Sequence, residues 1–210
     1  MRTSVLLLLS FCFLFLLDSS CANAGQLTVL DGSGKPLQHA VVELTDEPVE
    51  SAAKAVAVMD QINKQFVPFI LTIQKGQLVN FPNSDDIRHH VYSFSAVKPF
   101  ELKLYAGTPN QPLKFENAGV VVLGCNIHDS MVGYIYIADD KQVLVSDANG
   151  LVTLPNSTKQ VTVWHPYQDN DIDSRQTVQI VNTTAPMSVT IKTTYPAPRN
   201  TFGERFGQHE

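Results

Sequence analysis

Short runs of β-branched and aromatic residues alternate with clusters of glycine, proline, asparagine, aspartate and serine along most of the chain. This pattern predicts short antiparallel strands packed as a β-sandwich. In the middle of the chain the strands are expected at Val56–Gln61, Phe66–Ile73, Gln77–Phe81, His90–Phe94, Glu101–Tyr105, Gly119–Gly124 and Tyr134–Ile137. Pro68 lacks an amide hydrogen, so it predicts an edge strand or a bulge within its run.

Further β-rich runs flank this middle part and are expected to form a second, smaller β-sandwich. They are Gln26–Leu30 and His39–Leu44 on one side, and Val143–Leu154, Val161–Trp164, Gln176–Val181 and Met187–Ile191 on the other. Asp147–Gly150 predicts a hairpin turn inside one of these runs. The first piece is too short to fold alone, so the two pieces are expected to combine, with separate flanking strands in tandem as the alternative.

The first 24 residues have the pattern of a secretory signal peptide. A basic start at Arg2 precedes the apolar run Val5–Leu17, and Ala22-Asn23-Ala24 offers a cleavage site that would leave the protein in the periplasm. No membrane span is expected after cleavage, because the apolar run is short for a transmembrane helix. A retained helix and a lipid anchor at Cys21 are the alternatives.

These patterns together predict a domain organisation. It comprises a signal peptide at 1–24, an outer sandwich built from 25–50 and 139–194, a central domain at 51–138 and a disordered tail at 195–210. The fold class is therefore expected to be all-β, with one sandwich in the centre and a second one formed by the flanking segments.

The composition and charge of the chain restrict the kinds of partner. Of its 210 residues, 44% are hydrophobic, which is ordinary for a globular chain, and the net charge is −5. No block of lysine and arginine is present, so neither nucleic acid nor an anionic membrane surface is expected as a partner. The acidic runs Asp85-Asp86 and Asp169–Asp173 are interpreted as solvated loops.

Cys125 is the one cysteine that stays after removal of the predicted signal peptide. It has no partner for an internal disulfide, and a free thiol in an oxidising compartment is a liability unless a metal occupies it. His128 and Met131 follow Cys125 at intervals of three, in a short turn between two apolar runs. With a second imidazole from His89 or His90, this soft donor set selects copper and suits electron transfer.

Residues from about Val56 to Ala138 resemble the cupredoxins, the small blue-copper domains of plastocyanin, amicyanin and pseudoazurin. The resemblance is carried by three pieces in the same order as in the family: Gly76-x-x-Val79-x-Phe81-x-Asn83, His89-x-Val91 and Cys125-x2-His128-x2-Met131. The last piece has the short spacing of the ligand loop of amicyanin. The resemblance implies a Greek-key β-sandwich that holds one copper ion, which cycles between Cu(I) and Cu(II).

The resemblance also implies a role for each ligand. Cys125 supplies the strong copper–sulfur bond, Met131 is a weak axial ligand, and His128 is the port for electrons at the surface. His89 is preferred over His90 as the fourth ligand. Successive side chains of a strand point to opposite faces, and the His-x-Val pattern of the family falls on His89.

Asn83, His90 and Ile127 are expected beside the ligands, where they would tune the site. His90 stands where relatives carry an asparagine that ties the two ligand loops together, and its imidazole can preserve such a tie. Ile127 stands where relatives often carry proline, so its N–H is free to donate to the Cys125 thiolate. That hydrogen bond would stabilise Cu(I), which predicts a relatively high reduction potential.

The flanking segments resemble a carboxypeptidase-regulatory-like or transthyretin-like β-sandwich. The matching features are Val29-x-Asp31-x-x-Gly34-x-Pro36-Leu37-x-x-Ala40-Val41-Val42-x-Leu44 and Ser146-Asp147-Ala148-Asn149-Gly150-x-Val152-x-Leu154. The copper domain would then be inserted between the two parts of this sandwich.

The predicted function is an exported electron carrier. Its partners would be redox proteins, such as c-type cytochromes or periplasmic oxidoreductases, in small and transient contacts. A periplasmic copper-binding or copper-delivery protein without redox turnover is the alternative. An enzyme is not expected, because the sequence outside the blue site offers no further histidine pairs for a second copper centre. An adhesive role of the outer sandwich stays open.

Overall fold

The computed structural model describes residues 25–48, 55–181 and 185–196. The predicted signal peptide and residues 197–210 of the predicted tail lie outside this range. Within it the chain forms strands and turns without any helix, so it contains no helix that could cross a membrane. The prediction of an all-β chain is confirmed.

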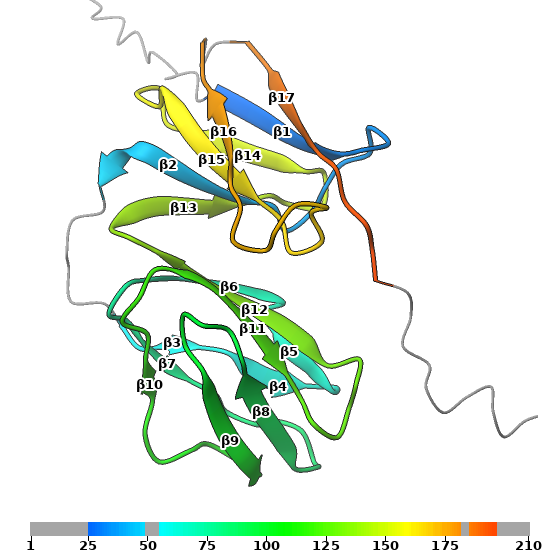
Figure 1. The fold of residues 1–210 in the computed structure, drawn as a ribbon. Coiled ribbons are helices and arrows are strands. Elements are labelled where there is room, and N and C mark those ends of the chain that lie inside the picture. Colours follow the sequence, from blue (N-terminus) through cyan, green and yellow to red (C-terminus); the bar gives the residue numbers. More distant parts are fainter. Residues whose placement is uncertain (1–24, 49–54, 182–184, 197–210) are drawn as a thin grey trace, which may run out of the picture.

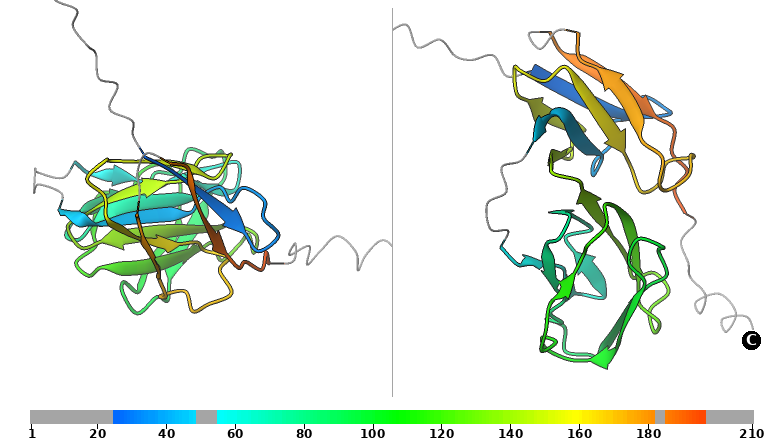
Figure 2. Two further views of the ribbon diagram at one scale, coloured as in Figure 1. Left: turned by 90° about the horizontal axis from the view of Figure 1, so that it is seen from above. Right: turned by 60° about the vertical axis from the view of Figure 1, so that its left-hand side comes forward.

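Two β-units are stacked end to end (Figures 1 and 2). The inner unit contains β3 (Ala57–Val58), β4 (Asp60–Ile62), β5 (Gln65–Val67), β6 (Ile70–Gln74), β7 (Leu78–Asn80), β8 (His89–Ser93), β9 (Phe100–Tyr105), β10 (Leu113–Lys114), β11 (Gly119–Gly124) and β12 (Val132–Ala138). The outer unit contains β1 (Gly25–Asp31), β2 (Val41–Pro48), β13 (Lys141–Val145), β14 (Leu151–Leu154), β15 (Gln160–Trp164), β16 (Gln176–Gln179) and β17 (Met187–Ile191).

The inner unit encloses a hydrophobic core between its sheets. One sheet has the strand order β6-β12-β11-β8-β9 and another has the order β10-β7-β3, while β4 and β5 form a hairpin. The core includes Phe81, Phe115, Val121 and Ile135, and Cys125 and Met131 belong to the same cluster. Of the predicted metal ligands in the loop after β11, Cys125 and Met131 are therefore fixed to the wall of a packed interior.

The outer unit is assembled from both ends of the described chain. Its sheets have the orders β14-β1-β17 and β13-β2-β15-β16, and they share one core that includes Leu27, Leu44, Val152 and Val163. The chain leaves this unit after β2 and re-enters it through β13, and these two strands are hydrogen-bonded neighbours. The inner unit is thus inserted between two adjacent strands of one sheet.

Strand β12 joins the two units because it is buried on both faces. Ile135 and Ile137 point into the inner core, whereas Tyr134 and Tyr136 pack with Trp164 of the outer unit. A strand that is covered on both sides is apolar throughout, which explains the continuous run of hydrophobic residues here. The Tyr136 hydroxyl donates to Glu43 (3.0 Å) and accepts from Arg175 Nε (2.9 Å), so polar contacts also link the units.

Two expectations about strand pairing are corrected by the structure. Asp147–Gly150 does form a turn, with Gly150 N–H donating to the carbonyl of Asp147, but no hairpin follows from it. β13 pairs with β2 and β14 pairs with β1, so the turn leads from one sheet to the other. Nor is the pairing antiparallel throughout, because β6 with β12, β3 with β7 and β1 with β17 are parallel pairs. At Pro68, where an edge strand or a bulge within one run was expected, the run is instead divided into β5 and β6.

His165 gives the outer unit a pH-dependent stability. Its buried ring donates from Nε2 to the carbonyl of Gln38 and accepts at Nδ1 from the N–H of Tyr167, a pattern that only the neutral ring can make. Burial lowers the pKa of His165 from 6.5 to about 4. The folded state disfavours the proton that the unfolded chain accepts, so stability falls as the pH drops from about 6.5 towards 4, by roughly 2–3 kcal/mol.

This effect is checked by urea unfolding of the metal-free natural protein and of the metal-free variant His165→Gln, each at pH 7 and at pH 4.5. The variant should be less stable at pH 7 and should lose less stability than the natural protein on acidification. Parallel pH profiles of the two proteins would contradict the assignment to His165.

Candidate metal centre

The ligand loop, residues Cys125–Met131, connects β11 to β12 and is anchored at both ends. The N–H of Met131 donates to the carbonyl of His128 (2.9 Å), which closes a turn inside the loop. Cys125 and Met131 are 3% and 1% exposed. Before Cys125, the ring of Tyr92 packs so closely on Gly124 that a Cβ there would lie 2.7 Å from it. The backbone that presents Cys125 is therefore held by packing on its outer side as well.

Strand β8 supplies the imidazole of His89. Its residues alternate between buried and partly exposed positions, with His89, Val91 and Ser93 pointing inward and His90 and Tyr92 outward. His89 is completely buried. The structure thus places His89 at the inner face, as the alternation of side chains along a strand requires.

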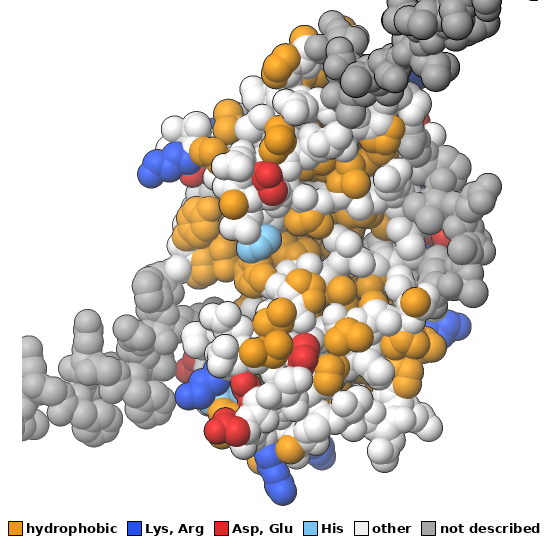
Figure 3. All heavy atoms as spheres, turned by 180° about the vertical axis from the view of Figure 1, so that it is seen from behind, with side chains coloured by type: hydrophobic (Ala, Val, Ile, Leu, Met, Phe, Trp, Pro, Cys, Tyr) orange, Lys and Arg blue, Asp and Glu red, His pale blue; other side chains and the backbone are white. Residues whose placement is uncertain are grey.

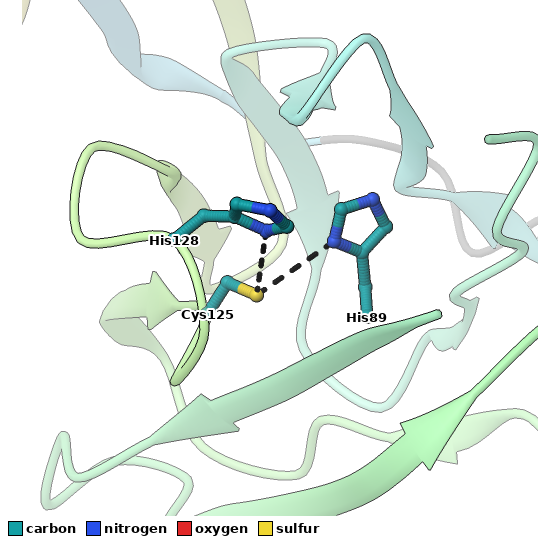
Figure 4. A group of neighbouring side chains, drawn as sticks. All are labelled: His89, Cys125 and His128. Carbon is teal, nitrogen blue, oxygen red and sulfur yellow. Dashed lines mark hydrogen bonds between the residues drawn. The ribbon is translucent and has the colours of Figure 1, made fainter. Parts of the chain in front are cut away.

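His89, Cys125 and His128 converge on one point, where Nδ1 of each histidine points towards the sulfur (Figure 4). Their donor atoms all lie within 4.8 Å of one another. The Cys125 Sγ lies 3.8 Å from Nδ1 of His89 and 3.7 Å from Nδ1 of His128. Metal bonds of about 2.3 Å to sulfur and 2.0–2.1 Å to nitrogen, at angles of about 110–120°, separate such atoms by roughly 3.6–3.8 Å. The spacing therefore fits one shared metal ion.

A carboxylate that the sequence did not single out contacts this group. Nε2 of His89 lies 2.6 Å from Oδ2 of Asp85, whose side chain is 11% exposed. Asp85 was interpreted as part of a solvated acidic loop, and the structure shows that this interpretation was wrong for Asp85. Asp85 precedes His89 by four residues. This short separation is the sequence feature that could have pointed to the contact.

The pKa values of two groups are displaced in ways that suit metal binding. Partial burial, with the nearby His89 as a second cause, lowers the pKa of His128, which favours the neutral ring that a metal needs. Desolvation acts to raise the pKa of Asp85. Hydrogen bonds from Lys64 N–H, from His89 and from Asn63 N–H outweigh it, so the pKa lies below its ordinary value and the group is a carboxylate.

Asn83, predicted to lie beside the ligands, holds the loop that precedes β8. Its Nδ2 donates to the carbonyls of Ile87 (2.8 Å) and Tyr105 (2.9 Å), and its Oδ1 accepts from the N–H of Asp85 (3.1 Å). Asn83 is itself buried. Asn83 therefore supports the site indirectly, because it holds Asp85 and the loop that leads to His89.

His90 and Ile127 do not make the contacts that were expected of them. Nε2 of His90 lies 3.0 Å from Oε1 of Glu101 on β9, and among the described residues no hydrogen bond joins His90 to the ligand loop. Likewise, the hydrogen bonds of the described residues include none from the Ile127 N–H to the Cys125 sulfur. The Ile127 side chain is 50% exposed, so it forms part of the surface beside His128.

A cleft of about 680 Å³ lies beside the ligand loop, between the two units. Asp129 and Ser130 of the loop line it from the inner unit, and Pro166 and Tyr167 line it from the outer unit. Figure 3 shows hydrophobic side chains gathered along the waist between the two units on one face of the molecule. The outer unit thus faces one flank of the ligand loop across this cleft.

Comparison with known proteins gives matches among solved structures. An oxidised proline-to-glycine mutant of amicyanin is 18% identical over 46% of this chain and 98% of its own, with a TM-score of 0.37. A purple cupredoxin from Nitrosopumilus maritimus is 21% identical over 40% of this chain and its whole length, at 0.35. The copper-containing nitrite reductase NirK of Thermus scotoductus is 23% identical over 54% of this chain and 28% of its own, at 0.38.

No protein-family profile matches the chain, and no curated protein matches it in sequence. The resemblance of the outer unit to carboxypeptidase-regulatory-like sandwiches stays an expectation. The support for a metal site is the convergence of His89, Cys125 and His128 in this chain.

Proposed function

We propose that residues 55–138 form a cupredoxin and that the protein carries single electrons between exported redox proteins through one copper ion. The observation that supports this most directly is the group of two imidazole nitrogens and one thiol sulfur, spaced for a shared ion, in which His89 and Cys125 are buried. Two imidazoles and a thiolate are the equatorial donors of blue-copper electron-transfer sites.

Each donor has a distinct part in this proposal. Cys125 provides the thiolate, and His89 and His128 present Nδ1 as neutral ligands. Met131 ends the same loop and is buried in the same hydrophobic cluster as Cys125, so we infer that its thioether would be the fourth and weakest donor. A copper ion bound there would change between Cu(I) and Cu(II) as it accepts and releases one electron.

The surroundings keep the donors in place and keep water away from them. His89, Cys125 and Met131 are buried. Strand β8, which carries His89, and strands β11 and β12, which flank the ligand loop, are each paired on both sides. Donors held in this way change position little between the two oxidation states. His128 is partly exposed and lies beside the exposed side chain of Ile127, so it offers the shortest route from the site to a partner.

The cellular setting is part of the same proposal. The signal-peptide pattern of residues 1–24 supports export to the periplasm. There the partners would be c-type cytochromes or other oxidoreductases, bound in small, transient contacts. We propose a carrier and not an enzyme, since one electron gained and lost at one ion requires no second reactive site.

The test is a titration of the purified, signal-free protein with Cu(II), followed by redox cycling. One equivalent of copper should produce an intense visible thiolate-to-copper absorption that disappears with a mild reductant and returns with an oxidised c-type cytochrome. The copper content should stay at one ion per chain throughout. Absence of the absorption would refute the proposal. Copper that passes to a chelator or acceptor protein during cycling would favour a delivery protein instead.

A further inference from the structure

Asp85 is held in a fixed position by four hydrogen bonds. The N–H of Asn63 donates to its Oδ1 (2.5 Å) and the N–H of Lys64 to its Oδ2 (2.9 Å). Asn63 and Lys64 form the turn between β4 and β5, both with positive φ (54° and 59°), so their amides are held towards the carboxylate. The backbone N–H of Asp85 donates to Oδ1 of Asn83. The fourth hydrogen bond joins Oδ2 of Asp85 to Nε2 of His89.

His89 in turn has two different neighbours at its two ring nitrogens. Nε2 faces the carboxylate at 2.6 Å, and Nδ1 faces the Cys125 sulfur at 3.8 Å. A carboxylate accepts and does not donate, so the proton of the neutral ring belongs on Nε2. The lone pair of Nδ1 is then directed at the metal position before any metal binds.

We propose that Asp85 is a positioning residue of the metal centre: it fixes the Nε2–H tautomer and the orientation of His89, and its charge strengthens His89 as a ligand for Cu(II). A carboxylate that accepts from a ligating histidine raises the basicity of the ring, and a more basic ring favours the more highly charged ion. Asp85 therefore lowers the reduction potential. This redox consequence rests on the proposed copper function, whereas the tautomer and orientation do not.

The positioning role is tested first without metal and without a mutation. In the metal-free natural protein, ¹H–¹⁵N spectra of the histidine side chains should show His89 protonated at Nε2 and unprotonated at Nδ1, with a slowly exchanging, low-field proton. A proton on Nδ1 in that state would overturn the inference. Because no copper is present, this result does not depend on the proposed function.

The electronic role is tested with Asp85→Asn, which keeps the shape of the side chain and removes its charge. The matched control is Asp86→Asn, which removes the same charge from an exposed neighbour. Among the described residues, the hydrogen bonds and ion pairs of His89 include one to Asp85 and none to Asp86. We expect Asp85→Asn to shift the Nε2 proton and to weaken Cu(II) binding by about 10–100-fold. Binding of Cu(I) should weaken less, and each tenfold difference between the two raises the potential by about 59 mV.

Asp86→Asn should leave the proton resonance, the Cu(II) affinity and the potential close to those of the natural protein. If Asp85→Asn and Asp86→Asn shift the potential equally, the contact with His89 has no specific role and the inference fails. That outcome would leave the proposed function intact, provided that the natural protein still shows the copper–thiolate absorption. If the natural protein shows no such absorption, the proposed function is refuted. The metal-free spectra would then still decide whether Asp85 positions His89.

Discussion

Replacing Cys125 by serine is expected to abolish the visible absorption of the copper-loaded protein and to weaken Cu(II) binding by more than about 100-fold. The sulfur lies near both imidazole nitrogens, at 3.8 and 3.7 Å. A serine hydroxyl is a hard donor that stays protonated near neutral pH, so it replaces neither the charge nor the covalency of a thiolate. Absorption spectra and competition with a copper chelator measure the two effects.

The control for this substitution is Ser130→Ala, which changes an exposed side chain of the same loop. It should retain the absorption and the affinity. Metal-free Cys125→Ser should still unfold in one cooperative transition, at a somewhat lower denaturant concentration, because a hydroxyl replaces the larger and less polar thiol at a buried position. A Cys125→Ser protein that binds copper with unchanged absorption would show that the sulfur is not a ligand.

Truncating Trp164 to alanine is expected to cost about 3–5 kcal/mol of folding free energy. Its indole is completely buried between the two units, and its Nε1 donates to the carbonyl of Ile172 (2.7 Å). The ring packs against Tyr134 and Tyr136 of β12, with centroid separations of 6.0 and 5.6 Å. The substitution leaves a cavity. It also removes one of the two aromatic rings, those of Trp164 and Tyr136, over which the guanidinium of Arg175 lies.

Urea unfolding of the metal-free protein measures this loss. Phe94→Ala is the control, because it removes an aromatic ring that is 87% exposed and should cost less than about 1 kcal/mol. Trp164→Ala should also loosen the contact of the outer unit with β12, which amide exchange at Tyr134 and Tyr136 would report. Equal midpoints for Trp164→Ala and Phe94→Ala would show that the interface contributes little to stability.

Local regularities account for most of what could be predicted. The alternation of polar and apolar residues predicted a strand from His90, one residue later than its observed start at His89. It also required that only one histidine of the pair point inward, and the family pattern His-x-Val selected His89. The spacing of Cys125, His128 and Met131 also predicted one short loop between two strands. These features depend only on residues that are close along the chain.

Pairing between distant segments could not be read in the same way. The turn at Asp147–Gly150 has the residues of a hairpin, yet the strands on its two sides pair with β2 and β1 and not with each other. The residues of β6 and β12 contain no pattern that predicts the parallel pairing of these two strands. Turn residues constrain four positions of the backbone, whereas the choice of a neighbour depends on the burial of whole faces.

The sequence by itself determined that this protein is all-β and which residue types form a soft donor set, because strand periodicity and ligand spacing are short-range properties. Only the tertiary structure decided that His89 meets Cys125 and His128 at one point and that Asp85 stands behind His89. Thirty-six residues separate His89 from Cys125 along the chain. Their approach results from the packing of β8 beside β11, and the place of Asp85 results from a turn more than twenty residues upstream that holds its carboxylate.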